Sequence, residues 1–275
     1  MTRRGATLGF VSEEKIRLGG MALANGVLVH GPTSWACAIR TDDGELKVVA
    51  RRKRFSGAKI ESPLLRGPAR LADALVIVPQ IRRALPEARL PFQRPGVLAA
   101  MLGSAVVVKL VRTSTRLGPA AQELASGLLS VAPAALALRG PDVAAYHGAE
   151  HISIGTYEHG AQAQREHERC GSHLLGPLLV TTAIGNTLAA RAPAHLRTAA
   201  RLSAQLVAVA ASTEIFGWMV RNPEKRLARA LAKPGHELQH RVATAEPTPE
   251  QLEVAEAALA RCLELERAAD GADSN

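Results

Sequence analysis

The chain has 275 residues, of which 47% are hydrophobic and only 3% aromatic, and it carries a net charge of +9. Its three cysteines, Cys37, Cys170 and Cys262, are far apart and odd in number, which excludes a small disulfide-framework protein. The charge does not indicate nucleic-acid binding: the one dense basic run, "RRKRF" at 51–55, lacks interleaved aromatics for base stacking. Most other cations flank apolar segments, so we expect membrane lipids as partners and no nucleic acid.

Residues 1–62 are expected to form an N-terminal β-containing region followed by a basic linker. The apolar "GVLVHG" at 26–31 and two short strands around Asp43-Gly44 predict antiparallel strands, since Asp-Gly is a strong hairpin-turn signal. An amphipathic helix over 64–85, interrupted by Pro79, should follow the linker.

Residues 63–245 are expected to form a helical, membrane-associated domain. The apolar stretches that suggest this lie at 95–108, 124–138, 174–190 and 202–220. A bilayer asks for about 17–25 apolar residues per crossing, and these four are short and interrupted. Hydropathy alone therefore leaves two readings open, membrane helices or the buried helices of a soluble bundle. Glu214 has a different meaning in each reading. In a membrane helix an ionisable side chain marks a functional site, whereas in a soluble bundle Glu214 simply faces water.

The tail, residues 246–275, predicts a soluble amphipathic helix. Thr248 is the expected N-cap, Pro249 the first helical residue, and Gln251 completes a capping box with Thr248. The fold class is thus mainly α, with about four apolar segments, a small N-terminal β region and this C-terminal helix.

Five of the nine histidines lie within residues 145–173. His147 and His151 are four residues apart, so they share one face of a helix. Glu150 completes H-x-x-E-H, a pattern in which the histidines bind one metal ion and the glutamate polarises a bound water. Five residues of pattern are weak evidence alone, and Gly148 lowers the helix propensity here.

A second motif, H-x-x-C at His167 and Cys170, has the spacing of zinc ligands at a turn or helix end. Together the motifs offer two ligand pairs separated by a loop. A thiolate with imidazoles favours zinc among the divalent metals. His159 and His173 are expected to be bystanders.

Three nearby side chains have two interpretations each. Glu158 is either a solvated glutamate or a further ligand on the same helix face as His147. Tyr146 and Tyr157, the only tyrosines in the chain, either pack in the core or position a substrate.

The segments "GGMALANGVLVHGP" (19–32), "YHGAEHISIGTYE" (146–158), "HERCGSHLL" (167–175) and the tail "ATAEPTPEQLEVAEAAL" resemble, in the same order, the bacterial YqhQ-type family. That family has no known function and is regarded as metal-dependent membrane enzymes. The resemblance implies a multi-pass protein of the bacterial cell membrane, and it extends the candidate residues to Arg169 and to Glu214 in a late helix.

The first of these segments departs from the family pattern. Met21, Asn25 and His30 stand where the family has glutamine, glutamate and arginine. If those polar side chains serve substrate or metal, this chain has lost part of the site.

Two functions follow from these expectations. In the first, the protein is a metal-dependent hydrolase at the membrane, with His147, His151, Cys170 and His167 as ligands and Glu150 as general base. In the second, a closed metal site is structural, and the protein is a membrane scaffold or assembly factor. A homo-oligomer is compatible with both, and "RRKR" favours a cytoplasmic N-terminal part.

Overall fold

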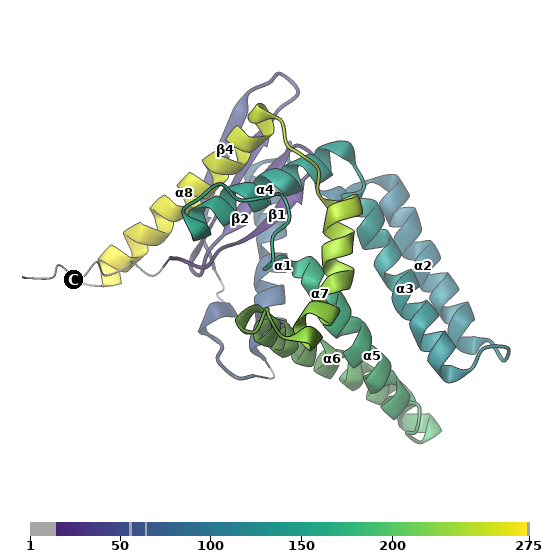
Figure 1. Cartoon of the computed structure of the whole chain (residues 1–275). Coiled ribbons are helices and arrows are strands. Elements are labelled where there is room, and N and C mark those ends of the chain that lie inside the picture. The colour runs from purple at the N-terminus through teal and green to yellow at the C-terminus, as the bar shows by residue number, and fades with distance from the viewer. Residues whose placement is uncertain (1–14, 55–56, 64, 274–275) are drawn as a thin grey trace, which may run out of the picture.

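The computed structural model describes residues 15–54, 57–63 and 65–273 (Figure 1). Within them the protein is mainly helical and has one four-stranded antiparallel sheet in the order β1-β2-β3-β4. The strands are β1 (Gly19–Leu23), β2 (Gly26–His30), β3 (Ser34–Arg40) and β4 (Leu46–Arg52). The N-terminal β region is therefore confirmed, and Gly44 takes the positive φ of +81° that the predicted Asp43-Gly44 turn requires.

Helices cover both faces of this sheet. Helix α1 (Arg66–Ala84) packs Ile77 and Ile81 against Leu28 and Cys37 on one face. On the other face, α4 (Pro141–His159) and α8 (Pro249–Asp273) pack against the strands and each other (Figure 1). Pro79 does not interrupt α1, because the fully buried Ile77 and Ile81 hold the helix to the sheet on both sides of it.

The remaining helices connect this sheet unit to two long hairpins. They are α2 (Pro95–Thr113), α3 (Pro119–Leu138), α5 (Leu175–Ala189), α6 (Arg197–Arg221) and α7 (Arg226–Leu238). Short 3-10 turns lie at η1 (Gly57–Lys59), η2 (Pro91–Gln93), η3 (Gly171–Leu174) and η4 (Ala194–Leu196), and η5 (Gln239–Ala243) is a π-helical turn.

The pairs α2–α3 and α5–α6 form antiparallel hairpins that extend from the sheet unit toward the same side (Figure 1). Among the described residues, three helices are long and apolar enough to cross a membrane: Pro95–Thr113, Ala121–Leu138 and Ala194–Arg221. The expectation of about four such segments is wrong for 174–190, where α5 has only 15 residues. At 1.5 Å per residue it spans about 22 Å, less than the ~30 Å of a hydrocarbon core.

A chain of polar side chains joins the two hairpins near their tips. Arg112 lies 3.4 Å from Glu123, and Asn186 donates a hydrogen bond to the same carboxylate at 2.6 Å. Gln205 in turn donates to Asn186 at 3.0 Å. Asn186, which interrupts the third apolar stretch, thus serves to connect α5 with α3 and α6.

Helix α8 is capped at its start and fastened to the sheet near its end. At its start Thr248 and Gln251 exchange hydrogen bonds, with N to Oε1 at 2.9 Å and N to Oγ1 at 3.3 Å, so the predicted capping box is present. Near its end the carboxylate of Glu266, 3% exposed, accepts hydrogen bonds from the backbone N–H groups of Thr33 (2.9 Å) and Ser34 (2.6 Å) and from the Thr33 hydroxyl (2.8 Å). A Cβ at Gly31 would lie 2.6 Å from this carboxylate, which explains the glycine there.

We predict that Glu266→Ala lowers the free energy of unfolding by about 2–4 kcal/mol, because it leaves two backbone N–H groups without their acceptor. Amide exchange at Thr33 and Ser34 should accelerate in the same variant. Glu264→Ala is the control, since Glu264 is 64% exposed and, among the described residues, pairs only with Arg261 on its own helix. Unchanged exchange at Thr33 and Ser34 in Glu266→Ala would contradict the clamp.

Candidate functional site

Helix α4 places His147, Glu150 and His151 on a buried face, with side chains between 2% and 9% exposed. Gly148 lies between them despite its low helix propensity. A Cβ at Gly148 would lie 2.1 Å from the carbonyl oxygen of Ala245, and the N–H of Ala245 donates to the carbonyl of Ala144 at 2.9 Å. Glycine is therefore required so that the segment after α7 can lie against α4.

Backbone carbonyls orient both imidazoles. His147 Nδ1 lies 2.8 Å from the carbonyl of Ala243, and His151 Nδ1 lies 2.6 Å from the carbonyl of Arg165. A carbonyl only accepts, so each Nδ1 carries the proton and each Nε2 presents its lone pair. Burial, followed by the neighbouring His147, lowers the pKa of His151 to about 2, which keeps this imidazole neutral.

Cys170 completes the group from the loop that leads into η3. Its Sγ lies 3.6 Å from His147 Nε2, and one ligand atom from each of His147, His151 and Cys170 lies within 4.8 Å of the others. Burial raises the pKa of the Cys170 thiol. Two imidazole lone pairs and a sulfur thus converge on one point.

The carboxylate of Glu150 adjoins this point, 3.8 Å from His147 Nε2 and 3.9 Å from His151 Nε2. Burial raises the pKa of Glu150 to about 8, and the nearby His147 opposes that shift. Gly20 on β1 lies over Glu150, because a Cβ there would be 2.4 Å from Glu150 Oε1. Gly20 itself is exposed, and the buried carboxylate of Glu150 lies directly against its backbone.

The second histidine motif divides in the structure. His167 Nε2 lies 3.1 Å from Glu158, whose other oxygen accepts a 2.6 Å hydrogen bond from Arg169. Burial acts to raise the pKa of Glu158, but the hydrogen bond with His167 and the charge of Arg169 lower it below its usual value. His167 therefore faces Glu158, while its ring centroid remains 5.5 Å from that of His151.

Gln239, in the π-helical turn η5, holds the loop that carries Cys170. No pattern in the sequence indicates this role. Gln239 is fully buried, its Oε1 accepts from the N–H of His167 at 2.9 Å, and its Nε2 donates to the His167 carbonyl at 3.2 Å and to Ser172 Oγ at 2.6 Å. The same turn supplies the Ala243 carbonyl that orients His147, and π-helical turns recur at functional sites. His173, expected to be a bystander, is buried beside Gln239 with Nδ1 3.3 Å from Nε2.

Three other candidates have contacts of their own, and His159, expected to be a bystander, lies apart from the donors. Tyr146 lies in the core between the sheet and α8, and the hydroxyl of Tyr157 accepts a hydrogen bond from the N–H of Ile16 at 3.0 Å. Glu214 pairs with Arg66 and so joins α6 to α1. His159 is exposed at the end of α4.

The departures from the family pattern lie away from the histidine cluster. Met21 packs on the α1 face of the sheet. Asn25 bonds the carbonyls of Arg40 and Glu87 at 3.2 and 3.1 Å. His30 lies 3.2 Å from Lys53, whose ammonium is buried against Asp73 at 2.6 Å.

The donor set fits a transition metal ion. In each histidine Nδ1 is bonded to a backbone carbonyl and Nε2 is turned to the other donors, which is the arrangement typical of metal-ligating histidine. Without a cation or a proton between them, the two Nε2 lone pairs and the sulfur would be buried against one another without a partner. The site thus defines the protein as a mainly helical one with a buried His/His/Cys group that could hold a metal ion.

Residues 140–265 match the family model described as "Protein of unknown function (DUF1385)". The matched stretch contains α4, the Cys170 loop, and α7 with its π-helical turn. Glu266 is the first residue beyond it. No curated protein and no solved structure matches the sequence.

We predict that Gln239→Leu raises the alkylation rate of Cys170 about tenfold, because losing these buried hydrogen bonds lowers the free energy of opening the loop by ~1.4 kcal/mol or more. Cys37 and Cys262, both 0% exposed, are internal references in the same chain. Gln80→Leu is the control, since Gln80 bonds only Val76 of its own helix. Equal rates in the two variants would show that Gln239 does not hold the loop.

Proposed function

We propose that this protein is a membrane protein that binds one divalent transition metal ion, zinc by donor preference, through His147 Nε2, His151 Nε2 and Cys170 Sγ. The observation that carries the proposal is the convergence of these three donors within 4.8 Å, with both Nδ1 atoms bonded to backbone carbonyls. Imidazole and thiolate donors together suit zinc. His167 would have to give up Glu158 to become a fourth ligand, so we assign it to the supporting network.

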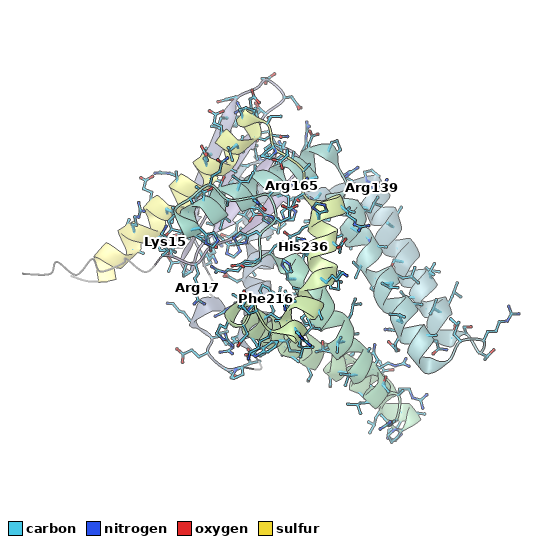
Figure 2. All side chains as sticks on the ribbon, in the orientation of Figure 1. Lys15, Arg17, Arg139, Arg165, Phe216 and His236 are labelled. Atoms are coloured by element: carbon cyan, nitrogen blue, oxygen red, sulfur yellow. The ribbon has the colours of Figure 1, made fainter. Side chains whose placement is uncertain are left out.

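The membrane location is supported by the two hairpins. Few side chains of α2, α3 and α6 are buried, and large apolar residues such as Leu102, Leu110 and Leu206 are more than 60% exposed. Apolar surface of this extent is not stable in water and is what a lipid environment accepts. Figure 2 shows side chains projecting outward along both hairpins. We further propose that the chain is a divergent member of the bacterial YqhQ-type family.

For the chemistry we propose hydrolysis of a lipid- or peptide-type bond. A bound divalent ion would supply a Lewis acid that raises the reactivity of water and of a carbonyl or phosphoryl group. Glu150 would accept the proton of the attacking water and return it to the leaving group, because its carboxylate adjoins the donors without being one of the three.

A structural metal site is the second candidate, and one observation favours it. Glu150 is only 3.8–3.9 Å from both histidine nitrogens, so a small rotation would make it a fourth ligand and close the site. The protein would then be a membrane scaffold or assembly factor whose Cys170 loop is held by metal.

We predict that the full chain purified from membranes contains about one zinc-like ion per chain, and that Cys170→Ala and His151→Ala each lose most of it. His159→Ala is the matched control, because His159 is exposed at the end of the same helix. Elemental analysis of the four proteins is the measurement. Metal content unaffected by Cys170→Ala would refute the assignment of the ligands.

We predict that Glu150→Gln retains the metal and loses hydrolysis by about a hundredfold or more, as expected when a general base is removed. Glu158→Gln is the control carboxylate, with metal retained and a smaller loss of activity. Hydrolysis is measured on a panel of phospholipid esters and peptides, and X-ray absorption counts the ligands. Loss of metal in Glu150→Gln, with four protein donors in the wild type, would favour the structural site.

A further inference from the structure

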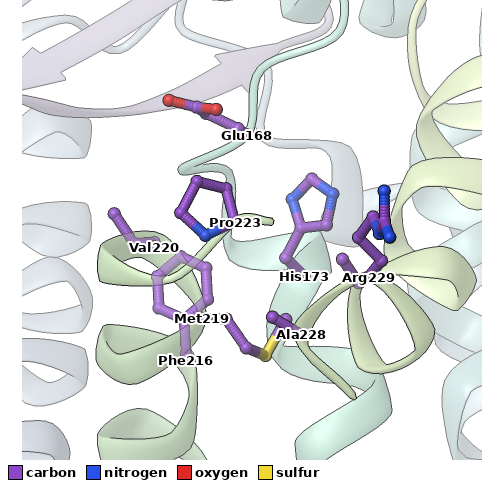
Figure 3. A pocket seen from close by; sticks show the side chains of 9 residues that line it. Glu168, His173, Phe216, Met219, Val220, Pro223, Ala228 and Arg229 are labelled. Carbon is purple, nitrogen blue, oxygen red and sulfur yellow. The ribbon is translucent and has the colours of Figure 1, made fainter. Parts of the chain in front are cut away.

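A cavity of about 100 Å³ lies where the end of α6 meets α7 (Figure 3). Phe216, Met219 and Val220 of α6 form one wall, and Ala228 and Ala232 of α7 form part of the other. The cavity has room for a few methylene groups. Its lining is apolar except at the rim, where Arg229, His173 and Glu168 lie.

The cavity opens within a concentration of positive charge. Five exposed cations follow one another in the segment that leaves α6: Arg221, Lys225, Arg226, Arg229 and Lys233. Glu224 is the one acid among them, and none of the five forms an ion pair within the part of the chain that the structure describes. Arg229 thus presents a guanidinium without a partner beside an apolar cavity. This pairing suits an amphiphile with an anionic head.

The position of the cavity along the chain identifies the kind of amphiphile. Helix α6 ends a segment long enough to span a membrane, Ala194–Arg221, and the five cations begin at its last residue. Clusters of four to eight Lys or Arg residues directly beside a membrane helix are recognition elements for anionic lipids. The cavity is therefore at the depth where phosphate headgroups meet the first methylene groups of their chains.

We infer that the α6–α7 cavity is a binding site for an anionic phospholipid, with Arg229 on the phosphate and the first part of the lipid between Phe216 and Ala232. The inference rests on the membrane location proposed above and is independent of the hydrolase. Glu168 is the one acid among the described residues that line the cavity, and in Figure 3 it lies apart from Arg229.

The site has a direct connection to the donor cluster. His173 lines the cavity and contacts Gln239, and the N–H of His173 donates to the carbonyl of Cys170 at 3.1 Å. A lipid held at Arg229 therefore rests against the residues that position Cys170.

The test uses full-length protein in an uncharged detergent, with lipid binding counted by native mass spectrometry. Wild-type protein should retain one phosphatidylglycerol and bind phosphatidylcholine more weakly. Arg229→Gln should weaken phosphatidylglycerol binding about fivefold, the effect of removing one cation at a lipid surface. Ala232→Phe should weaken it by filling the cavity without changing the charge.

Two controls and one competitor separate this site from general attraction. Arg191→Gln removes an exposed cation from the turn between α5 and α6, at the opposite end of α6 from the cavity. Ala230→Phe adds a ring at an exposed position of α7 outside the cavity lining. Both variants should bind the lipid like wild type. Glycerol 3-phosphate, the head without chains, should not displace the lipid.

Several outcomes would overturn the inference. The first three are equal binding of the two lipids, equal effects of Arg229→Gln and Arg191→Gln, and displacement of the lipid by glycerol 3-phosphate. The fourth is a lipid-free dimer that Ala232→Phe dissociates, because it would assign the cavity to a second copy of the chain. Recovery of the wild-type chain in the soluble fraction without detergent would refute the membrane location together with the inference. Equal lipid binding by detergent-solubilised protein would leave the membrane location intact.

Discussion

The hydrogen bonds from His147 and His151 to the carbonyls of Ala243 and Arg165 determine which nitrogen each ring offers, and the rest of the site is arranged around that choice. They require the segments after α7 and before Cys170 to lie directly against α4, and the first of these contacts requires Gly148. The π-helical turn supplies both the Ala243 carbonyl and Gln239, so one irregular turn orients an imidazole and holds the cysteine loop. The donors are thus fixed by main chain from three separate parts of the sequence.

Spacing in the sequence was sufficient to identify the donors on α4, because a helix puts residues four apart on one face. It was also sufficient for the turn at Gly44 and the capping box at Thr248, since both depend only on local geometry. The direction of His167 was not accessible from spacing. H-x-x-C places His167 and Cys170 close together, but the pairing of Glu158 with Arg169 decides where the ring faces.

The role of Gln239 and the position of β1 could not be predicted from a single sequence, because both depend on contacts with other segments of the chain. Gln239 lies in an unremarkable polar segment, and its importance comes from contacts with residues some seventy positions earlier in the chain. Strand β1 begins with two glycines and gains its place by pairing with β2 rather than from intrinsic propensity. The length of each helix was equally hard to predict. Helix α5 is mostly apolar but ends after 15 residues, while Pro79 and Pro133 lie within continuous helices.

The clamp of α8 on the Thr33–Ser34 turn has a consequence for the order in which the protein is assembled. Residues 19–52 leave the ribosome well before residues 249–273, yet these later residues cover part of one face of their sheet. Both hairpins are synthesised between these two events. Part of the face that carries Val27 and Val29 therefore stays uncovered until α8 has been made, and a chain that stops before Val254 leaves this apolar surface open to association with other chains.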